Sequence, residues 1–400
     1  MKFDSLVKIF YSNPKEHKAV YSERFSAPFA VHLPIEIQQF NHDKSYPAFY
    51  CYNQEVVLLT EQIYQLFADF LLITQNVSDV VMRQFRLSCI IAEVHSTSDI
   101  EGIHSTHREL KDILESSSSK SHFSSIIKKY DLLSSGEIPS FTTCEDVRNF
   151  YDEFVHVDAI AGNPKNLLDG KIFRKEAVDV RTPSGKIIHR GLEPEEKIIK
   201  VMSDALSYLN SSEVPALVRI AVFHYLFVYI HPFYDGNGRT ARFISSCSIA
   251  RHLHPLIALR LAVTIKRHKR SYYSMLKDTD AEINCGDLTP FILGFLEFIA
   301  ETIEDINKIL THKVAQLERM KARLNSILLD DEARAIGWLI LQASTFYGHG
   351  ATMNELMECC GRSRNTVKKT LAEMPIRVSG TRTKFYKLDW ERLRNSCLGG

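Results

Sequence analysis

Residues 231–242 read His231-Pro232-Phe233-Tyr234-Asp235-Gly236-Asn237-Gly238-Arg239-Thr240-Ala241-Arg242, and this stretch decides how the 400-residue chain is interpreted. Gly236 and Gly238 permit positive φ angles and close backbone approach, so successive N–H groups can form an anion-binding nest at the start of a helix. Arg239 and Arg242 lie on one face of that helix, where forked donors can each bind a phosphate. The stretch predicts a loop between two helices that binds phosphates.

The same stretch supplies the other groups that a nucleotide-transfer site needs. Asp235 is a hard oxygen ligand of the kind that Mg²⁺ prefers when it bridges two phosphates. His231 follows the apolar run Ile220 to Ile230 and is suited to accept a proton near neutral pH. A lone His-Pro or Gly-Asn-Gly is usually structural, but at residue frequencies near five per cent nine fixed positions match by chance about once in 10¹¹ sites. The combination predicts catalysis.

The stretch resembles the signature of the Fic family, His-Pro-Phe-x-(Asp/Glu)-Gly-Asn-Gly-Arg-x-x-Arg, and every fixed position is met. The resemblance implies an all-α Fic core that transfers AMP from ATP to a Ser, Thr or Tyr hydroxyl of a target protein, a protein adenylyltransferase. It makes His231 the general base and Asp235 the Mg²⁺ ligand. It assigns ATP binding to Gly236, Asn237, Gly238, Arg239, Thr240, Ala241 and Arg242, with the last on the γ-phosphate.

Two further segments resemble parts of this family. The family's flap, a hairpin that aligns the target by strand addition, resembles residues 178–188, where Val178 and Val180 alternate with charged residues before a turn at 182–185. Ser271-Tyr272-Tyr273 resembles the family's downstream region, which makes Tyr273 a candidate for packing on the adenosine. Core packing is the commoner role for a tyrosine at helical spacing, and it stays open at this point.

An upstream segment, Thr97-Ser98-Asp99-Ile100-Glu101-Gly102, resembles the family's inhibitory motif (Ser/Thr)-x-x-x-Glu-(Gly/Asn). The resemblance implies that Glu101 pairs with Arg242 and restrains the enzyme. Thr97 and Glu101 are spaced to share one helix face, and Gly102 suits a helix C-terminus. The spacing is common in helices by itself, so the prediction of autoinhibition depends on the signature.

The sequence pattern predicts three regions: an N-terminal helical region with the inhibitory motif over residues 1–125, a Fic core over 126–325 and a winged helix-turn-helix over 326–400. Helical spacing covers 53–101, 194–208, 216–230, 240–252 and 291–324. In the last region we expect helices over 331–343, over 352–360 and after the cap Ser363, then strands over 378–381 and 384–388.

Basic side chains gather in the C-terminal region although the formal net charge of the chain is only +1. Between residues 361 and 387 the single acid is Glu373, against Arg362, Arg364, Lys368, Lys369, Arg377, Arg382, Lys384 and Lys387. This concentration on an expected recognition helix and wing is typical of DNA contact. Docking of a target protein, or dimerisation, is an equally weighted alternative.

Composition sets the remaining expectations. The 8 cysteines include no CxxC pair, so neither a disulfide framework nor a zinc site is indicated, and a cytoplasmic location is expected. No leader and no charge-free membrane span is seen, which predicts no membrane attachment. A homodimer is left open. Two alternatives to AMP transfer remain: removal of AMP by a water that Glu101 positions, and a DNA-binding regulator that senses nucleotide.

Overall fold

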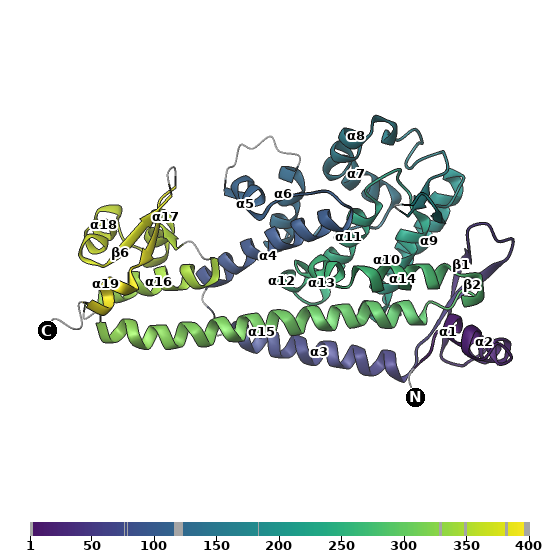
Figure 1. Cartoon of the computed structure of the whole chain (residues 1–400), viewed down its shortest axis with the longest axis horizontal. Helices are drawn as coiled ribbons and strands as arrows, with labels where there is room; N and C mark the ends of the chain where they lie inside the picture. The colour runs from purple at the N-terminus through teal and green to yellow at the C-terminus, as the bar shows by residue number, and fades with distance from the viewer. Residues whose placement is uncertain are drawn as a thin grey trace. The chain divides into compact units, whose positions relative to one another are not determined.

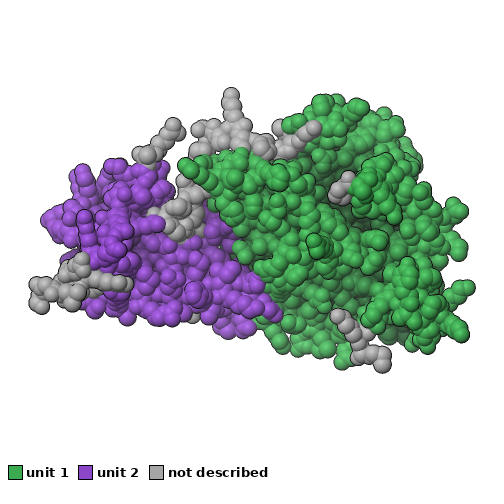
Figure 2. Space-filling model, in the orientation of Figure 1, with its two compact units in different colours: residues 1–67, 90–303 green, residues 68–89, 304–400 purple. Residues whose placement is uncertain are grey.

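The computed structural model describes residues 3–75, 77, 79–115, 123–182, 184–327, 330–347, 350–380 and 383–395. Over these residues the chain is predominantly helical, with small antiparallel sheets (Figure 1). It divides into two compact units, residues 1–67 with 90–303, and 68–89 with 304–400 (Figure 2). The three predicted regions are not tested by this division and stay a prediction. The serine-rich tract at their first boundary, residues 116–121, lies outside the described residues.

The first unit begins with α1 (Leu6–Ser12) and α2 (His17–Phe25) and continues into an antiparallel pair, β1 (Ala30–Gln38) and β2 (Ser45–Cys51). Leu33, Ile35 and Ile37 are buried while the residues between them are exposed. This alternation of period two gives β1 one buried face. The expectation of a helical N-terminal region is therefore corrected to helices with a two-stranded sheet.

Most of the first unit is helical. The elements after β2 are α3 (Gln54–Gln75), α4 (Asp79–Ile100), α5 (His107–Glu115), α6 (Phe123–Ser134), α7 (Cys144–Phe154), α8 (His156–Gly162), η1 (Pro164–Asn166), β3 (Asp179–Arg181), β4 (Ile187–Arg190), α9 (Glu195–Leu209), α10 (Ala216–Ile230), α11 (Asn237–His252), α12 (Pro255–Ala258), α13 (Leu261–Arg267), α14 (Lys269–Asp280), η2 (Glu282–Asn284) and α15 (Thr289–Ile327). Helix α10 is apolar and buried on nearly every side, and it packs against α9 and α11. It is the central helix of this unit.

Helix α11 begins inside the signature, earlier than the expected start at Thr240. The side chain of Asn237 explains this, because its Oδ1 accepts from the Phe233 N–H (2.9 Å) and its Nδ2 donates to the Phe233 carbonyl (2.7 Å). The Phe233 ring stacks on Tyr151 with centroids 3.7 Å apart. The loop is thus folded onto its own helix N-terminus, with Gly236 as the left-handed N-cap (φ 79°).

The second unit ends in a compact group of short elements. These are α16 (Asp331–Tyr347), β5 (Ala351–Thr352), α17 (Met353–Cys360), α18 (Arg364–Glu373), β6 (Ile376–Ser379), β7 (Phe385–Leu388) and α19 (Trp390–Asn395). The strands form an antiparallel sheet in the order β5-β7-β6. Ser363 caps α18 as expected, and Gly361 makes the left-handed turn between α17 and α18. Helix α16 extends beyond its expected end at residue 343, and β5 was not expected.

Helix α3 bears on the expected absence of membrane segments. It is long and apolar enough to cross a membrane by length and composition. It carries Glu55, Glu61 and Asp69, which is why the sequence shows no charge-free span there. Core helices of ordinary domains pass the same test, so the expectation of no membrane attachment stays a prediction.

Candidate active site

His231 lies directly after α10 in a left-handed backbone conformation (φ 53°). Its Nδ1 faces the Val228 carbonyl at 3.2 Å, and a carbonyl only accepts, so Nδ1 carries the proton and Nε2 keeps its lone pair. Burial, followed by the positive charges of His189 and Arg174, lowers the pKa of His231 to about 3. The ring is therefore neutral at physiological pH, with the lone pair on Nε2.

Arg174 holds this loop in place and was missed by the sequence reasoning. Its buried guanidinium donates to the backbone carbonyls of His231 (2.9 Å), Glu176 (2.7 Å) and Leu192 (2.8 Å). Burial lowers its pKa to about 10, so it stays charged near neutral pH. A Cβ at Gly191 would collide with Arg174 and His231, so only glycine fits there. No periodicity or motif marks Arg174, which lies in a segment without regular structure.

The start of α11 offers backbone rather than side-chain groups to a phosphate. The first-turn N–H groups of a helix lack intrahelical acceptors, and the helix dipole places positive charge there. The Asn237 amide is engaged by the loop, and the Thr240 hydroxyl donates to the Gly236 carbonyl (2.9 Å). Ala241 is buried and has no polar side-chain group. Of the predicted ATP-binding residues, these contribute through their backbone, while Arg239 and Arg242 bring charge.

Asp235 lies in the loop directly before this helix. Its side chain is exposed, and its Oδ1 accepts from the N–H of Gly236 at 2.6 Å. Within the described part of the chain, no group of three or more His, Cys, Asp or Glu side chains is arranged to hold a metal. Mg²⁺ is commonly bound by one or two carboxylates with substrate phosphates and water. The single carboxylate of Asp235 therefore fits Mg²⁺ that arrives with a nucleotide.

Arg242 is almost fully buried and is held by the segment that ends α4. Its Nη2 contacts Glu101 Oε1 at 2.6 Å and the Thr97 carbonyl at 3.1 Å, and its Nε donates to Thr97 Oγ1 at 2.9 Å. Gly102 follows with φ 77°, a conformation that favours glycine. A Cβ at Gly238 would collide with the Glu101 carboxylate. The structure thus brings the predicted inhibitory residues into contact with the second signature arginine.

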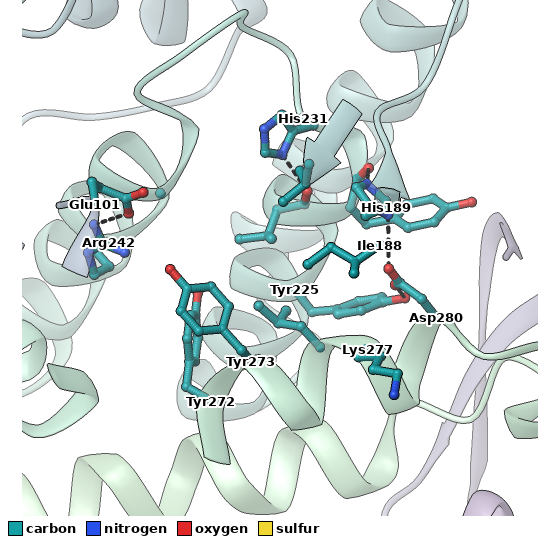
Figure 3. A pocket seen from close by; sticks show the side chains of 15 residues that line it. Glu101, Ile188, His189, Tyr225, His231, Arg242, Tyr272, Tyr273, Lys277 and Asp280 are labelled. Atoms are coloured by element: carbon teal, nitrogen blue, oxygen red, sulfur yellow. Dashed lines mark hydrogen bonds and ion pairs between the residues drawn. The ribbon is translucent and has the colours of Figure 1, made fainter. Parts of the chain in front are cut away.

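One cleft of about 730 Å³, counted to its open mouth, is lined by His231, Gly238, Arg242 and Glu101. Glu101 and Arg242 lie at one end, and His231 and the flap border the middle (Figure 3). Tyr273 lines the cleft with 39% of its surface exposed, whereas Tyr272 is buried and its hydroxyl meets His224 Nε2 at 2.9 Å. The core role belongs to Tyr272, whereas Tyr273 faces the open space of the cleft.

Strands β3 and β4 form the expected hairpin beside the cleft. Asp179 pairs with Arg190 in register, and their side chains add two bonds, at 2.7 and 3.3 Å. Val180 and Ile188 line the cleft with apolar surface. Pro183, in the expected turn, lies outside the described residues. The hairpin therefore presents a braced edge next to His231.

Comparisons with known proteins agree with this geometry. Residues 145–247 match the model of the Fic/DOC family. The chain is 31% identical over 170 residues to the protein adenylyltransferase Fic of Aedes aegypti, and 28% identical over 155 residues to the protein adenylyltransferase fic-1 of Caenorhabditis elegans. These alignments cover 41% and 38% of the chain and 28% of each relative's length. The chain thus matches just over a quarter of these relatives.

A solved structure extends the similarity in fold. The crystal structure of a Fic family protein from Desulfovibrio desulfuricans G20 superposes with a TM-score of 0.54 at 20% identity. The superposition covers 85% of this chain and 97% of that protein. At such identity the likeness concerns the fold alone. The fold is shared over a much longer stretch than the family model matches.

Proposed function

We infer, from the premise that this chain carries a Fic domain, that it transfers AMP from ATP to a Ser, Thr or Tyr hydroxyl of a target protein. The observation that carries this inference is the neutral His231 in one cleft with the N-terminus of α11 and the braced hairpin. A base, a phosphate site and an edge for a peptide are the parts that such a transfer requires.

In the proposed reaction the target hydroxyl oxygen attacks the α-phosphorus of ATP, and the bond from that phosphorus to the bridging oxygen breaks. His231 Nε2 takes the hydroxyl proton, and pyrophosphate leaves with the electron pair of the broken bond. The N–H groups at the start of α11, with Arg239 and Arg242, hold the charge on the phosphates. Mg²⁺ bound by Asp235 and phosphate oxygens would neutralise part of that charge.

Restraint by Glu101 is part of the proposal. The contact of 2.6 Å with Glu101 occupies the guanidinium that the γ-phosphate would need. ATP bound without this arginine would have its α-phosphorus misaligned, and a displacement of about 1 Å can change a rate about 10²-fold. Release of Glu101 then activates transfer.

The test is labelling from α-labelled ATP in a cell lysate by three proteins: the parent, Glu101→Gly, and Glu101→Gly combined with Arg242→Ala. We expect weak labelling by the parent, strong labelling by the single variant, including of the protein itself, and loss of the gain in the double variant. Absence of labelling by Glu101→Gly would sink the proposed activity. Equal labelling by the parent and Glu101→Gly would remove the restraint but not the transfer.

The same cleft supports the reverse process as an alternative. There Glu101 would orient a water that hydrolyses an AMP-modified hydroxyl. Incubating the parent and Glu101→Gly with an AMP-modified target separates the two functions. Release of AMP by the parent, lost in Glu101→Gly, would favour removal.

A second candidate function, DNA binding, is favoured by the exposed surface of α18. Arg364, Lys368 and Lys369 are all exposed on this helix, which follows α17 after a tight turn and precedes the β6–β7 hairpin. We propose that these elements form a winged helix. Part of the basic cluster is engaged elsewhere, since Arg377 pairs with Asp389 (2.8 Å). Arg382 lies outside the described residues.

Binding of duplex DNA by the full chain tests this second function. Fluorescence anisotropy should show an affinity that falls steeply with salt, because each phosphate contact releases counterions. Lys368→Gln with Lys369→Gln should weaken binding and flatten the salt dependence by about two phosphate contacts. Lys15→Gln with Lys18→Gln, equally exposed lysines of the other unit, is the matched control. No binding at low salt would favour docking of a target protein.

A further inference from the structure

The cleft contains a second ion pair that belongs to no motif. His189, on flap strand β4, meets Asp280, the last residue of α14, with Nδ1 and Oδ2 2.9 Å apart. The His189 and Asp280 side chains are only 12% and 14% exposed. In Figure 3 this pair lies across the cleft from the Glu101–Arg242 pair. It therefore invites a role separate from phosphate binding.

The hydrogen bonds of His189 fix its charge. Its Nε2 faces the Tyr229 carbonyl at 2.8 Å, and its Nδ1 faces the Asp280 carboxylate. A carbonyl and an ionised carboxylate only accept hydrogen bonds, so both ring nitrogens must donate. The Tyr225 hydroxyl donates to the other oxygen of Asp280 at 2.8 Å, so both carboxylate oxygens accept a hydrogen bond. His189 is accordingly an imidazolium.

We propose that His189 is a positioning residue for the transfer reaction: as an imidazolium held by Asp280 and the Tyr229 carbonyl, it fixes the flap beside His231. The proposal rests on the proposed function for its catalytic meaning. The structural part of the proposal, that a charged His189 anchors β4, depends only on the contacts described above.

The position of the anchor explains why it matters. His189 ties β4 to α10, which ends at the catalytic histidine, and to α14, which carries Tyr273. The next residue, Arg190, ties β4 to β3 through Asp179. The hairpin is thus braced internally and fastened to the two helices that border the cleft. A strand of the target protein that paired with this hairpin would therefore be held in a fixed position relative to His231.

The imidazolium also acts on the base through its charge. The rings of His189 and His231 have centroids 6.0 Å apart, and a positive charge at that distance opposes protonation of His231. Burial would lower the pKa of His189, but the Asp280 carboxylate and the Tyr229 carbonyl outweigh it and raise that pKa. The charged and titratable groups that face His189 are Asp280, Tyr225, Tyr229, His231 and Arg174.

The stabilisation that His189 gives to the flap should depend on pH. A histidine with a raised pKa contributes its stabilisation fully below its unfolded value near 6.5 and loses it as pH rises through the folded value. The anchor should therefore weaken at alkaline pH, where His189 becomes neutral. His231, whose pKa is lowered to about 3, does not titrate in that range.

The first experiment needs no activity. Imidazole ¹⁵N NMR of the full chain, assigned by comparison with His189→Gln, should show both ring nitrogens of His189 protonated at neutral pH. Hydrogen exchange of the β4 amides should be at least about tenfold faster in His189→Gln, because the strand loses its tether. His252→Gln, a change to an exposed histidine on α11, is the matched control and should leave β4 unchanged. A neutral His189, or unchanged exchange in His189→Gln, would overturn the anchor.

The second experiment measures transfer in the Glu101→Gly background. With His189→Gln or Asp280→Asn, kcat/KM for the target should fall about 10²-fold, while the Kd for ATP changes less than about threefold. The alkaline decline of activity should disappear in His189→Gln. Unchanged kcat/KM, or equal losses in target use and ATP binding, would contradict a positioning role. Absence of transfer by Glu101→Gly alone would refute the proposed function and leave the NMR and exchange tests decisive for the anchor.

Discussion

The two ends of the cleft each hold a cation paired with a carboxylate, yet the pairs have opposite proposed effects. In the proposed reaction Arg242 is a cation that the γ-phosphate needs, so its contact with Glu101 (2.6 Å) would withhold it. His189 is a cation that the substrate does not need, so its contact with Asp280 (2.9 Å) immobilises the flap without competing with phosphate. The role of an ion pair therefore depends on which other groups its members would bind.

Removing the base between the two pairs should have the largest effect. In the Glu101→Gly background, His231→Ala should lower transfer about 10²- to 10⁴-fold, the usual contribution of a positioned base. Binding of ATP, measured by calorimetry, should stay within a few-fold, because the N–H groups of α11 remain. Transfer that persisted in this variant would mean that neither pair is arranged around a base at His231.

The restraint at the Arg242 end can be divided into charge and hydrogen bonding. Glu101→Gly removes both and should raise transfer about 10²-fold. Glu101→Gln keeps an acceptor for Arg242 but no charge, and charge-assisted bonds are about twice as strong as neutral ones, so a gain of about tenfold or less is expected. The measurement is the initial rate of labelling with a competent target. If both variants gained equally, charge alone would account for the restraint.

A second buried histidine, His224, differs from His189 in its charge state. His224 meets Ser245 Oγ (2.8 Å) and the Tyr272 hydroxyl (2.9 Å), and Ser245 itself donates to the Ala241 carbonyl. Its Nδ1 therefore donates to Ser245, and in the neutral ring that burial favours, its Nε2 accepts from the Tyr272 hydroxyl, unlike Nε2 of His189. Burial, followed by the charge of Arg242, lowers the pKa of His224 to about 3.

This difference predicts a pH dependence of stability. Below about pH 6.5 the unfolded state takes up a proton at His224 that the folded state does not, so the free energy of unfolding falls by about 1.4 kcal/mol per pH unit from this group. The stabilisation is complete above that pH and is lost as pH falls toward the folded pKa. Urea unfolding of the parent and His224→Gln between about pH 6.5 and 5 measures it, and the variant should show the shallower slope. Parallel slopes would mean that His224 is protonated in the folded protein.

Thr97 should give the smallest change. Thr97→Val removes the hydroxyl that accepts from Arg242 Nε (2.9 Å) but keeps the Thr97 carbonyl and Glu101. One hydrogen bond contributes about 1 kcal/mol, which corresponds to about a fivefold gain in transfer. The same labelling assay checks it. A gain as large as that of Glu101→Gly would show that Thr97, not the carboxylate, dominates the restraint.

The two ends of the cleft also differ in how well their contacts could be predicted from the sequence. The contact of Glu101 with Arg242 joins residues far apart in the chain, yet each lies in a motif with fixed spacing, so the pairing was expected. His189, Asp280 and Arg174 belong to no motif, and their hydrogen bonds depend on how β4, α14 and the segment before β3 pack in space. Arg174 and His231, for instance, meet across 57 residues. The pattern of neighbouring residues in the sequence does not indicate contacts of this kind.

At two other places the sequence contains a signal for the observed structure and also a second signal against it. Leu33, Ile35 and Ile37 alternate as a half-buried strand does, but Pro34 within the run argues against a strand. Gly238 reads as a helix breaker, although it lies in the first turn of α11, where a Cβ would meet Glu101. In both cases tertiary packing overrode local propensity.

The carboxylate of Glu101 lies just beyond the last residue of α4, where the turn is closed by backbone hydrogen bonds from the Gly102 N–H to the Asp99 carbonyl (3.1 Å) and from the Ile103 N–H to the Ser98 carbonyl (3.0 Å). Helix ends open locally at a far smaller free-energy cost than global unfolding. Under the proposed restraint, the fraction of active molecules would follow the fraction of time for which this turn is open. Activation by this route would be graded rather than all-or-none, because the turn that carries Glu101 can open without unfolding the rest of the domain.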